Sequence, residues 1–223
     1  MGYLRTLSPR WEFTLVLLIA FGYPVLISFG RFTTLIPLRL ISDGSLRGLL
    51  IFEPAVLVLL GWFLYFRGWT FERLGLARPR PAAILLGIGL WLICSLAYRE
   101  LWYGLWYLAP ATMHSASTLP LVVPGISVTT AVIISLLNPI FEEVFVCGYI
   151  VSALAKPGNV WPAIHASVAV RLLYHLYQGP AGIIGVIPLG LLFAGYFARS
   201  RQLWPLLIAH ALFDLIGLVA YIR

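Results

Sequence analysis

Six ionisable side chains lie well inside apolar stretches in the second half of the chain: Glu142, Glu143, Arg171, His175, His210 and Asp214. An ionisable group costs several kcal/mol in the hydrocarbon of a membrane, so such groups are functional candidates. A carboxylate and an imidazole can deprotonate a water, and a second imidazole can donate to the oxyanion that forms when this water attacks an amide. The set predicts hydrolysis inside a membrane. The competing interpretation is a buried structural network without chemistry.

The same side chains are also plausible metal ligands, because a zinc hydrolase needs three protein ligands and one open position. The sequence contains no HExxH motif, no GxSxG motif and no paired intramembrane aspartates, which disfavours serine and aspartyl mechanisms. We expect no metal site and no cofactor, and a divalent metal such as zinc remains the alternative.

The composition defines the elements that must position these groups. Of 223 residues, 61% are hydrophobic and 10% are charged, and the mean hydropathy is +0.95. This excludes a soluble fold and a disordered chain, and two cysteines are too few for a disulfide scaffold. We predict an all-α, polytopic transmembrane helix bundle that forms a single integral membrane domain over residues 1–223, with a catalytic core at about 126–222.

Apolar runs long enough to cross a membrane predict about seven spans, within a range of six to eight. They lie near residues 11–36, 48–66, 82–108, 126–154, 160–178, 182–199 and 203–222. The fourth run is long and holds Pro139 near its middle, so we expect a kink or break there.

The distribution of charge predicts the orientation and the surroundings. With alternating spans, nine of the 15 basic residues gather on the N-terminal side and four on the opposite side, which places the N-terminus in the cytoplasm of a multi-pass cell-membrane protein. No soluble basic face is present, so we expect a lipid bilayer and no nucleic acid as partner. The five acids outside the candidate set are expected near span ends or in loops: Glu12, Asp43, Glu53, Glu72 and Glu100.

Depth arithmetic indicates that the candidate groups can meet. A rise of about 1.5 Å per residue places Glu142 about 18 Å, His175 about 22 Å, Asp214 about 16 Å and His210 about 10 Å from the same end of the bundle. Adjacent residues point about 100° apart, so one of Glu142 and Glu143 faces a pocket while the other reaches a neighbouring helix. Asp214 lies one turn after His210 and is expected to hold an imidazole N–H.

Three strings in the last 100 residues or so resemble the CPBP family, which comprises the CAAX proteases and the bacteriocin-processing enzymes called Abi. They are NPIFEEVFVCGYI from Asn138 to Ile150, then RLLYHLYQG, then WPLLIAHALFD. The first family motif, Glu-Glu-x-x-x-Arg-Gly, falls on Glu142, Glu143, Cys147 and Gly148. The second, Phe-x-x-x-His, falls on Arg171 and His175, and the third, His-x-x-x-Asn or Asp, falls on His210 and Asp214.

The resemblance implies an intramembrane endopeptidase of the glutamate type. In that mechanism Glu142 with His175 activates the water, Glu143 orients the surrounding network and His210 stabilises the oxyanion. The substrate would be a membrane-associated peptide or protein, cleaved near the cytoplasmic half of the bilayer. A prenylated CAAX tail is one candidate substrate.

Two positions depart from the family pattern. Cys147 stands where Arg is usual and Arg171 stands where Phe is usual, so we hypothesise that Arg171 supplies the missing charge from the neighbouring helix. Asp214 in place of Asn cannot donate to an oxyanion when ionised and is expected to keep His210 protonated. Two alternative functions remain, namely a metal-dependent membrane hydrolase using the same residues and a non-enzymatic membrane scaffold or immunity protein.

Overall fold

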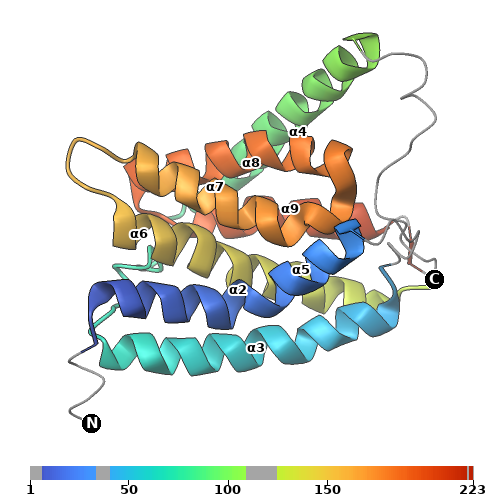
Figure 1. The fold of residues 1–223 in the computed structure, drawn as a ribbon. Coiled ribbons are helices and arrows are strands. Elements are labelled where there is room, and N and C mark those ends of the chain that lie inside the picture. Colours follow the sequence, from blue (N-terminus) through green and yellow to red (C-terminus); the bar gives the residue numbers. More distant parts are fainter. Residues whose placement is uncertain (1–6, 34–40, 109–124, 220, 223) are drawn as a thin grey trace.

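The computed structural model describes residues 7–33, 41–108, 125–219 and 221–222, and these residues form helices with no strand among them. The helices are α2 (Pro9–Thr33), α3 (Asp43–Phe66), α4 (Ala83–Leu108), α5 (Val128–Glu143), the π-helix η2 (Val144–Tyr149), α6 (Ile150–Leu154), α7 (Trp161–His175), the 3₁₀ turn η3 (Leu176–Gln178), α8 (Gly179–Ser200) and α9 (Trp204–Val219). Figure 1 shows them as a bundle in which α4 projects outward at one end. The predicted all-α helix bundle is confirmed.

A helix occupies each of the seven predicted apolar runs, but not all have the length of a full span. In the described part of the chain, five helices are long and apolar enough to cross a membrane: α2, α3, α4, the continuous α5–η2–α6 rod, and α8 from Gly182. Helix α9 is apolar but has only 16 residues, and α7 has 15. Helix α7 stops early because the chain turns through η3 to Gly179, whose φ of 74° does not continue a helix.

The break expected at Pro139 lies elsewhere. Helix α5 runs through Pro139 to Glu143, and the irregular segment is the π-helix η2, which starts at Val144. A proline removes one backbone hydrogen bond from the preceding turn, but Pro139 is buried inside α5 and the helix continues through it.

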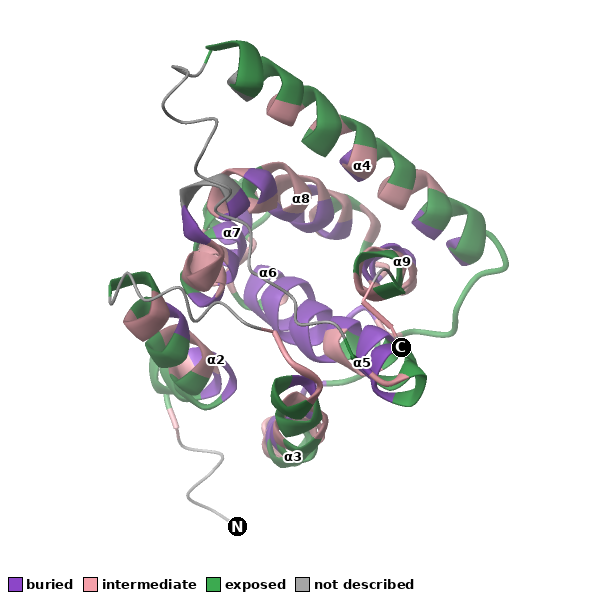
Figure 2. Cartoon of the chain, turned by 90° about the vertical axis from the view of Figure 1, so that its right-hand side faces the viewer, coloured by how far each residue is buried: buried purple, intermediate pink, exposed green. Residues whose placement is uncertain are grey.

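The α5–η2–α6 rod is the centre of the bundle. In the most apolar stretch of the rod 67% of the residues are buried, whereas the share is 11–39% in the other four long helices. Figure 2 looks along the rod and shows α2, α3, α7, α8 and α9 around it, with α4 outermost and mainly exposed. All residues of η2 are buried, whereas α5 keeps an exposed apolar face that includes Val132, Ile133 and Leu136.

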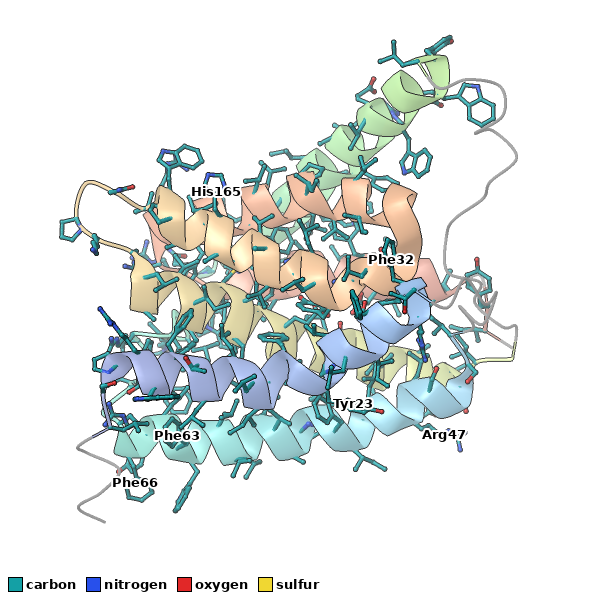
Figure 3. The ribbon with its side chains drawn as sticks, in the orientation of Figure 1. Tyr23, Phe32, Arg47, Phe63, Phe66 and His165 are labelled. Carbon is teal, nitrogen blue, oxygen red and sulfur yellow. The ribbon has the colours of Figure 1, made fainter. Side chains whose placement is uncertain are left out.

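A second buried polar cluster lies at the end of the bundle where α3 ends. Glu12 lies near a span end, as expected, and is buried there. Its carboxylate accepts hydrogen bonds from Arg67, from Trp69 Nε1 at 2.9 Å and from the Tyr149 hydroxyl at 3.4 Å. Figure 3 shows Phe66 at this end of α3 and Arg47 at the other. The cluster joins α2 and η2 to the segment after α3, which explains how an acid in the first turn of α2 becomes buried.

Gly148 allows the segment after α3 to cross η2. A Cβ at this position would lie 2.8 Å from the backbone oxygen of Leu74, closer than real Cβ atoms approach backbone. We predict that Gly148→Ala lowers the free energy of unfolding by about 1–3 kcal/mol, because the backbone of the crossing segment must move. Thermal unfolding of the purified protein in detergent measures the change.

Gly61→Ala is the matched control, because nothing lies within 4 Å of a Cβ there. This exchange inside α3 should leave stability unchanged or raise it by about 0.5–1 kcal/mol. Equal effects of the two substitutions would contradict the close approach at Gly148.

Candidate active site

Arg171 on α7 holds the two glutamates of α5. The residue is 1% exposed, and its Nη2 donates to Glu143 Oε1 at 2.7 Å and to Oε2 at 2.8 Å. Its Nη1 donates to Glu142 Oε2 at 3.3 Å. One guanidinium therefore binds two adjacent buried carboxylates. Arg171 lies beside Glu143, as the hypothesis that it supplies the missing motif charge requires.

The two glutamates point in different directions, as the 100° step between neighbours requires. Glu142 lines a cavity, whereas Glu143 is 0% exposed and lies outside the lining. Glu142 also accepts a hydrogen bond from the Tyr174 hydroxyl at 2.6 Å and one from Asn138 Nδ2 at 3.3 Å. The carboxylate facing the cavity is thus held in one orientation by three donors from α5 and α7.

The hydrogen bond of His175 defines which of its nitrogens is free. Nδ1 lies 3.0 Å from the backbone oxygen of Arg171. A carbonyl oxygen only accepts, so Nδ1 carries the proton and a neutral ring keeps the lone pair on Nε2. His175 lines the same cavity as Glu142 and can accept a proton there.

His210 on α9 forms its hydrogen bond with α5 and not, as expected, with Asp214 on its own helix. Nδ1 donates to Glu143 Oε1 at 2.7 Å, while Nε2 lies 3.7 Å from Asp214 Oδ1 and 3.9 Å from Glu142 Oε2. The expectation that Asp214 holds an imidazole N–H is wrong, because 3.7 Å is an ion-pair distance and too long for a hydrogen bond. The short aspartate side chain does not reach the ring, whereas the glutamate on α5 does.

The cavity has a volume of about 730 Å³ and is lined by residues from α2, α3, α5, α7, η3 and α9. Its lining residues with an acidic, basic or imidazole side chain are Arg31, Glu53, Glu142, His175, His210 and Asp214. Phenylalanine and tyrosine side chains form much of the rest, including Phe21, Phe52, Phe141 and Phe213. Polar groups thus converge in a largely apolar hollow, which is the usual character of a ligand site.

The cavity extends toward the end of the bundle where α2 ends and α3 begins, since Arg31 and Ser45 are both part of its lining. This end is opposite Pro9. If the N-terminus is cytoplasmic, as predicted, this end of the cavity lies toward the opposite face of the membrane, and cleavage in the cytoplasmic half of the bilayer stays a prediction.

The sequence did not single out three polar residues of this site. Asn138 and Tyr174 bind Glu142, and Glu53 on α3 lies beside Asn138. Glu53 was expected near a span end, but it is 2% exposed. Helix α3 starts at Asp43, ahead of the predicted span, and Glu53 lies roughly 20 Å from the Phe66 end, a depth like that of Glu142.

Residues 124–216 match the model of a family described as type II CAAX prenyl endopeptidase, Rce1-like. We refer to residues 124–216 as the Rce1-like region. The Rce1-like region contains the α5–η2–α6 rod, α7, α8 and most of α9, and with them all six candidate residues. The match confirms the resemblance to the CPBP family and supports, at family level, a peptidase in the membrane. No curated protein and no solved structure matches the chain.

The contribution of the Arg171 charge to this site can be tested by measuring stability. We predict that Arg171→Leu lowers the free energy of unfolding by about 3–5 kcal/mol, because it removes the guanidinium that binds both buried carboxylates. Arg171→Lys should lose less, since an ammonium keeps the charge but not the fork of the guanidinium. Thermal unfolding in detergent measures both.

A charge relocation gives the sharper comparison. Cys147 is fully buried on η2, one turn beyond Glu143. The double variant Cys147→Arg/Arg171→Leu should recover part of the stability lost by Arg171→Leu. Arg99→Leu, which alters an exposed arginine of α4, is the control and should change stability little. No recovery in the double variant would refute the hypothesis that Arg171 replaces the motif arginine.

Proposed function

We propose that the chain is an intramembrane endopeptidase of the glutamate type, which hydrolyses a peptide bond of a membrane-associated peptide or protein. The observation that carries the proposal is the pair of proton acceptors in one cavity, the Glu142 carboxylate and the Nε2 atom of His175. The Rce1-like match of the same residues supports it.

In this proposal Glu142 and His175 take a proton from a water in the cavity. The water oxygen forms a bond to the carbonyl carbon of the substrate, and the carbonyl oxygen becomes an oxyanion. The C–N bond then breaks, and the proton passes to the leaving nitrogen. A positioned general base of this kind contributes about 10²–10⁴-fold to a rate.

His210 supplies the hydrogen bond to the oxyanion. Its Nδ1–H is fixed by Glu143, so Nε2–H of the charged ring is the donor that faces the cavity. Asp214 at 3.7 Å and Glu142 at 3.9 Å from Nε2 favour the charged ring by Coulomb attraction. Arg171 and Glu143 touch no part of the cavity and act by orienting Glu142 and His210.

The apolar and aromatic lining fits a substrate that enters from the bilayer, and a prenylated tail remains one candidate. A multi-pass protein of the cell membrane with a cytoplasmic N-terminus remains our proposal for localisation. In that orientation the cavity extends toward the non-cytoplasmic face, so substrate would reach it from that side or from within the membrane.

A metal-dependent hydrolase is the second candidate, and one observation favours it. Glu142, Glu143 and His210 offer ligand atoms within 4.8 Å of one another, and all three residues are buried. Against it, Arg171 already donates to both carboxylates, which gives them the positive charge that a metal ion would supply.

Loss of either proton acceptor should remove the activity. We predict that Glu142→Gln and His175→Ala each lower peptide-bond cleavage at least 100-fold while the protein stays folded. Mass spectrometry of membrane proteins and peptides from cells with the wild type and with Glu142→Gln measures the cleavage and identifies the substrate.

His165→Ala is the matched control for His175→Ala. His165 is an exposed histidine on the same helix, stacked on Trp161, and Figure 3 shows it on the outer side of α7. It should keep wild-type cleavage. A cellular phenotype that survives both active-site substitutions would instead indicate a non-enzymatic scaffold or immunity protein.

Metal removal separates the two enzymatic candidates. We predict that cleavage by the purified protein is unchanged by EDTA and by 1,10-phenanthroline, and that elemental analysis detects no stoichiometric zinc. Loss of activity with a chelator, and its return with added zinc, would establish the metal-dependent hydrolase, since three ligands and an open position suffice for one.

A further inference from the structure

We propose that Glu53 is a positioning residue of the active site: it fixes the amide of Asn138, and this amide holds the carboxylate of Glu142 that faces the substrate. The inference rests on the proposed function. It adds a residue of α3, which lies outside the Rce1-like region, to the machinery of the site.

The amide of Asn138 is the bridge between the two carboxyl groups. Its Nδ2 donates to Glu53 Oε1 at 2.9 Å and to Glu142 Oε1 at 3.3 Å. An amide nitrogen has two protons, so one is available for each carboxyl group. Both hydrogen bonds run from Nδ2 to a carboxyl oxygen, so the nitrogen of the amide and not its oxygen faces the two glutamates.

The shorter of the two hydrogen bonds belongs to Glu53, so this residue determines the orientation of the amide. Asn138 alone has a free torsion about its terminal bond, and it lies one turn before Glu142 on the same helix. With Glu53 in place on a separate helix, the amide plane is held from outside α5. Glu142 then receives a donor of fixed direction on Oε1, opposite the donors on Oε2.

The two carboxyl groups differ in their other partners. Glu142 has Arg171 at 3.3 Å and His210 at 3.9 Å, and Tyr174 donates to it as well. For Glu53, within the residues that the structure describes, the second oxygen is buried and has no hydrogen-bond partner. A buried acceptor without a partner lowers stability, so the fold retains Glu53 at a cost.

This cost separates a positioning role from a structural one. A residue kept for stability lowers the unfolding temperature when it is replaced, whereas a residue kept for function at the expense of stability does not. Activity and stability should therefore move independently, or in opposite directions, at position 53.

The first experiment replaces Glu53 by Met, which has a similar length and no hydrogen-bonding group of comparable strength. We expect Glu53→Met to lower kcat about tenfold or more while KM stays within about twofold, because Glu142 is misdirected and not removed. The unfolding temperature in detergent should stay equal or rise. A fall in unfolding temperature together with kcat, or an unchanged kcat, overturns the proposal.

The second experiment tests the hydrogen bond itself. Glu53→Gln keeps an acceptor for Asn138 and should retain kcat within about threefold of the wild type, whereas loss as large as in Glu53→Met overturns the proposal. Asn138→Leu should lower kcat like Glu53→Met. The double variant Glu53→Met/Asn138→Leu should lower kcat no further, because the two residues act as one unit.

Ser135→Ala is the control on α5, one turn before Asn138. The Ser135 hydroxyl is buried and, among the described residues, has no hydrogen-bond partner, but it does not bind Glu142. Its loss should leave kcat unchanged. Cleavage by the wild type and its loss in Glu142→Gln are established first, so that their absence refutes the proposed function itself, while a fully active Glu53→Met refutes only this inference.

Discussion

The buried ion pair between Arg171 and Glu143 is the interaction on which the rest of the site depends. It joins α7 to the central rod at 2.7 Å, in a place where neither group can reach water. Each charge alone would cost several kcal/mol in such surroundings, so each requires the other. Once Glu143 is held, it orients His210 on α9 through Nδ1. One pair thereby positions groups from three helices.

The same pair explains why two adjacent glutamates serve different purposes. Glu143 has all its charge taken up by Arg171 and His210, and it lies outside the cavity. Glu142 shares the guanidinium only through a longer contact of 3.3 Å and keeps its face to the cavity. In the proposed mechanism the fully compensated carboxylate orients its neighbours, and the partly compensated one takes the proton from the water.

The rod that carries both glutamates changes its helical type directly after them. Helix α5 keeps Asn138 and Glu142 one turn apart on the cavity side, and the π-helix η2 begins at Val144. A π-turn holds one more residue than an α-turn and so rotates the faces of the helix that follow, a feature common at functional sites. All residues of η2 are buried, and Gly148 admits the segment after α3 at close range. The rod thus places Asn138 and Glu142 at the cavity and, at η2, lets the segment after α3 pack closely against it.

How much could be predicted from the sequence depends on whether a feature is local. Composition determined the helical membrane fold, because a chain this apolar must satisfy its backbone hydrogen bonds within helices. Glu142, His175 and His210 were found because ionisable groups are rare in apolar runs and their depths agree. Glu53 was missed because its span was predicted to start too late.

Only the tertiary structure decided which groups touch. The spacing of His210 and Asp214 favoured a hydrogen bond between them, yet the ring bonds to Glu143 from another helix. The rotation of each helix about its axis, and hence the partner of each side chain, follows from packing among helices and is not encoded in the spacing along any one of them. The sequence thus determined which residues enter the membrane with a charge, and the packing of α3, α5, α7 and α9 decided which of them form one site.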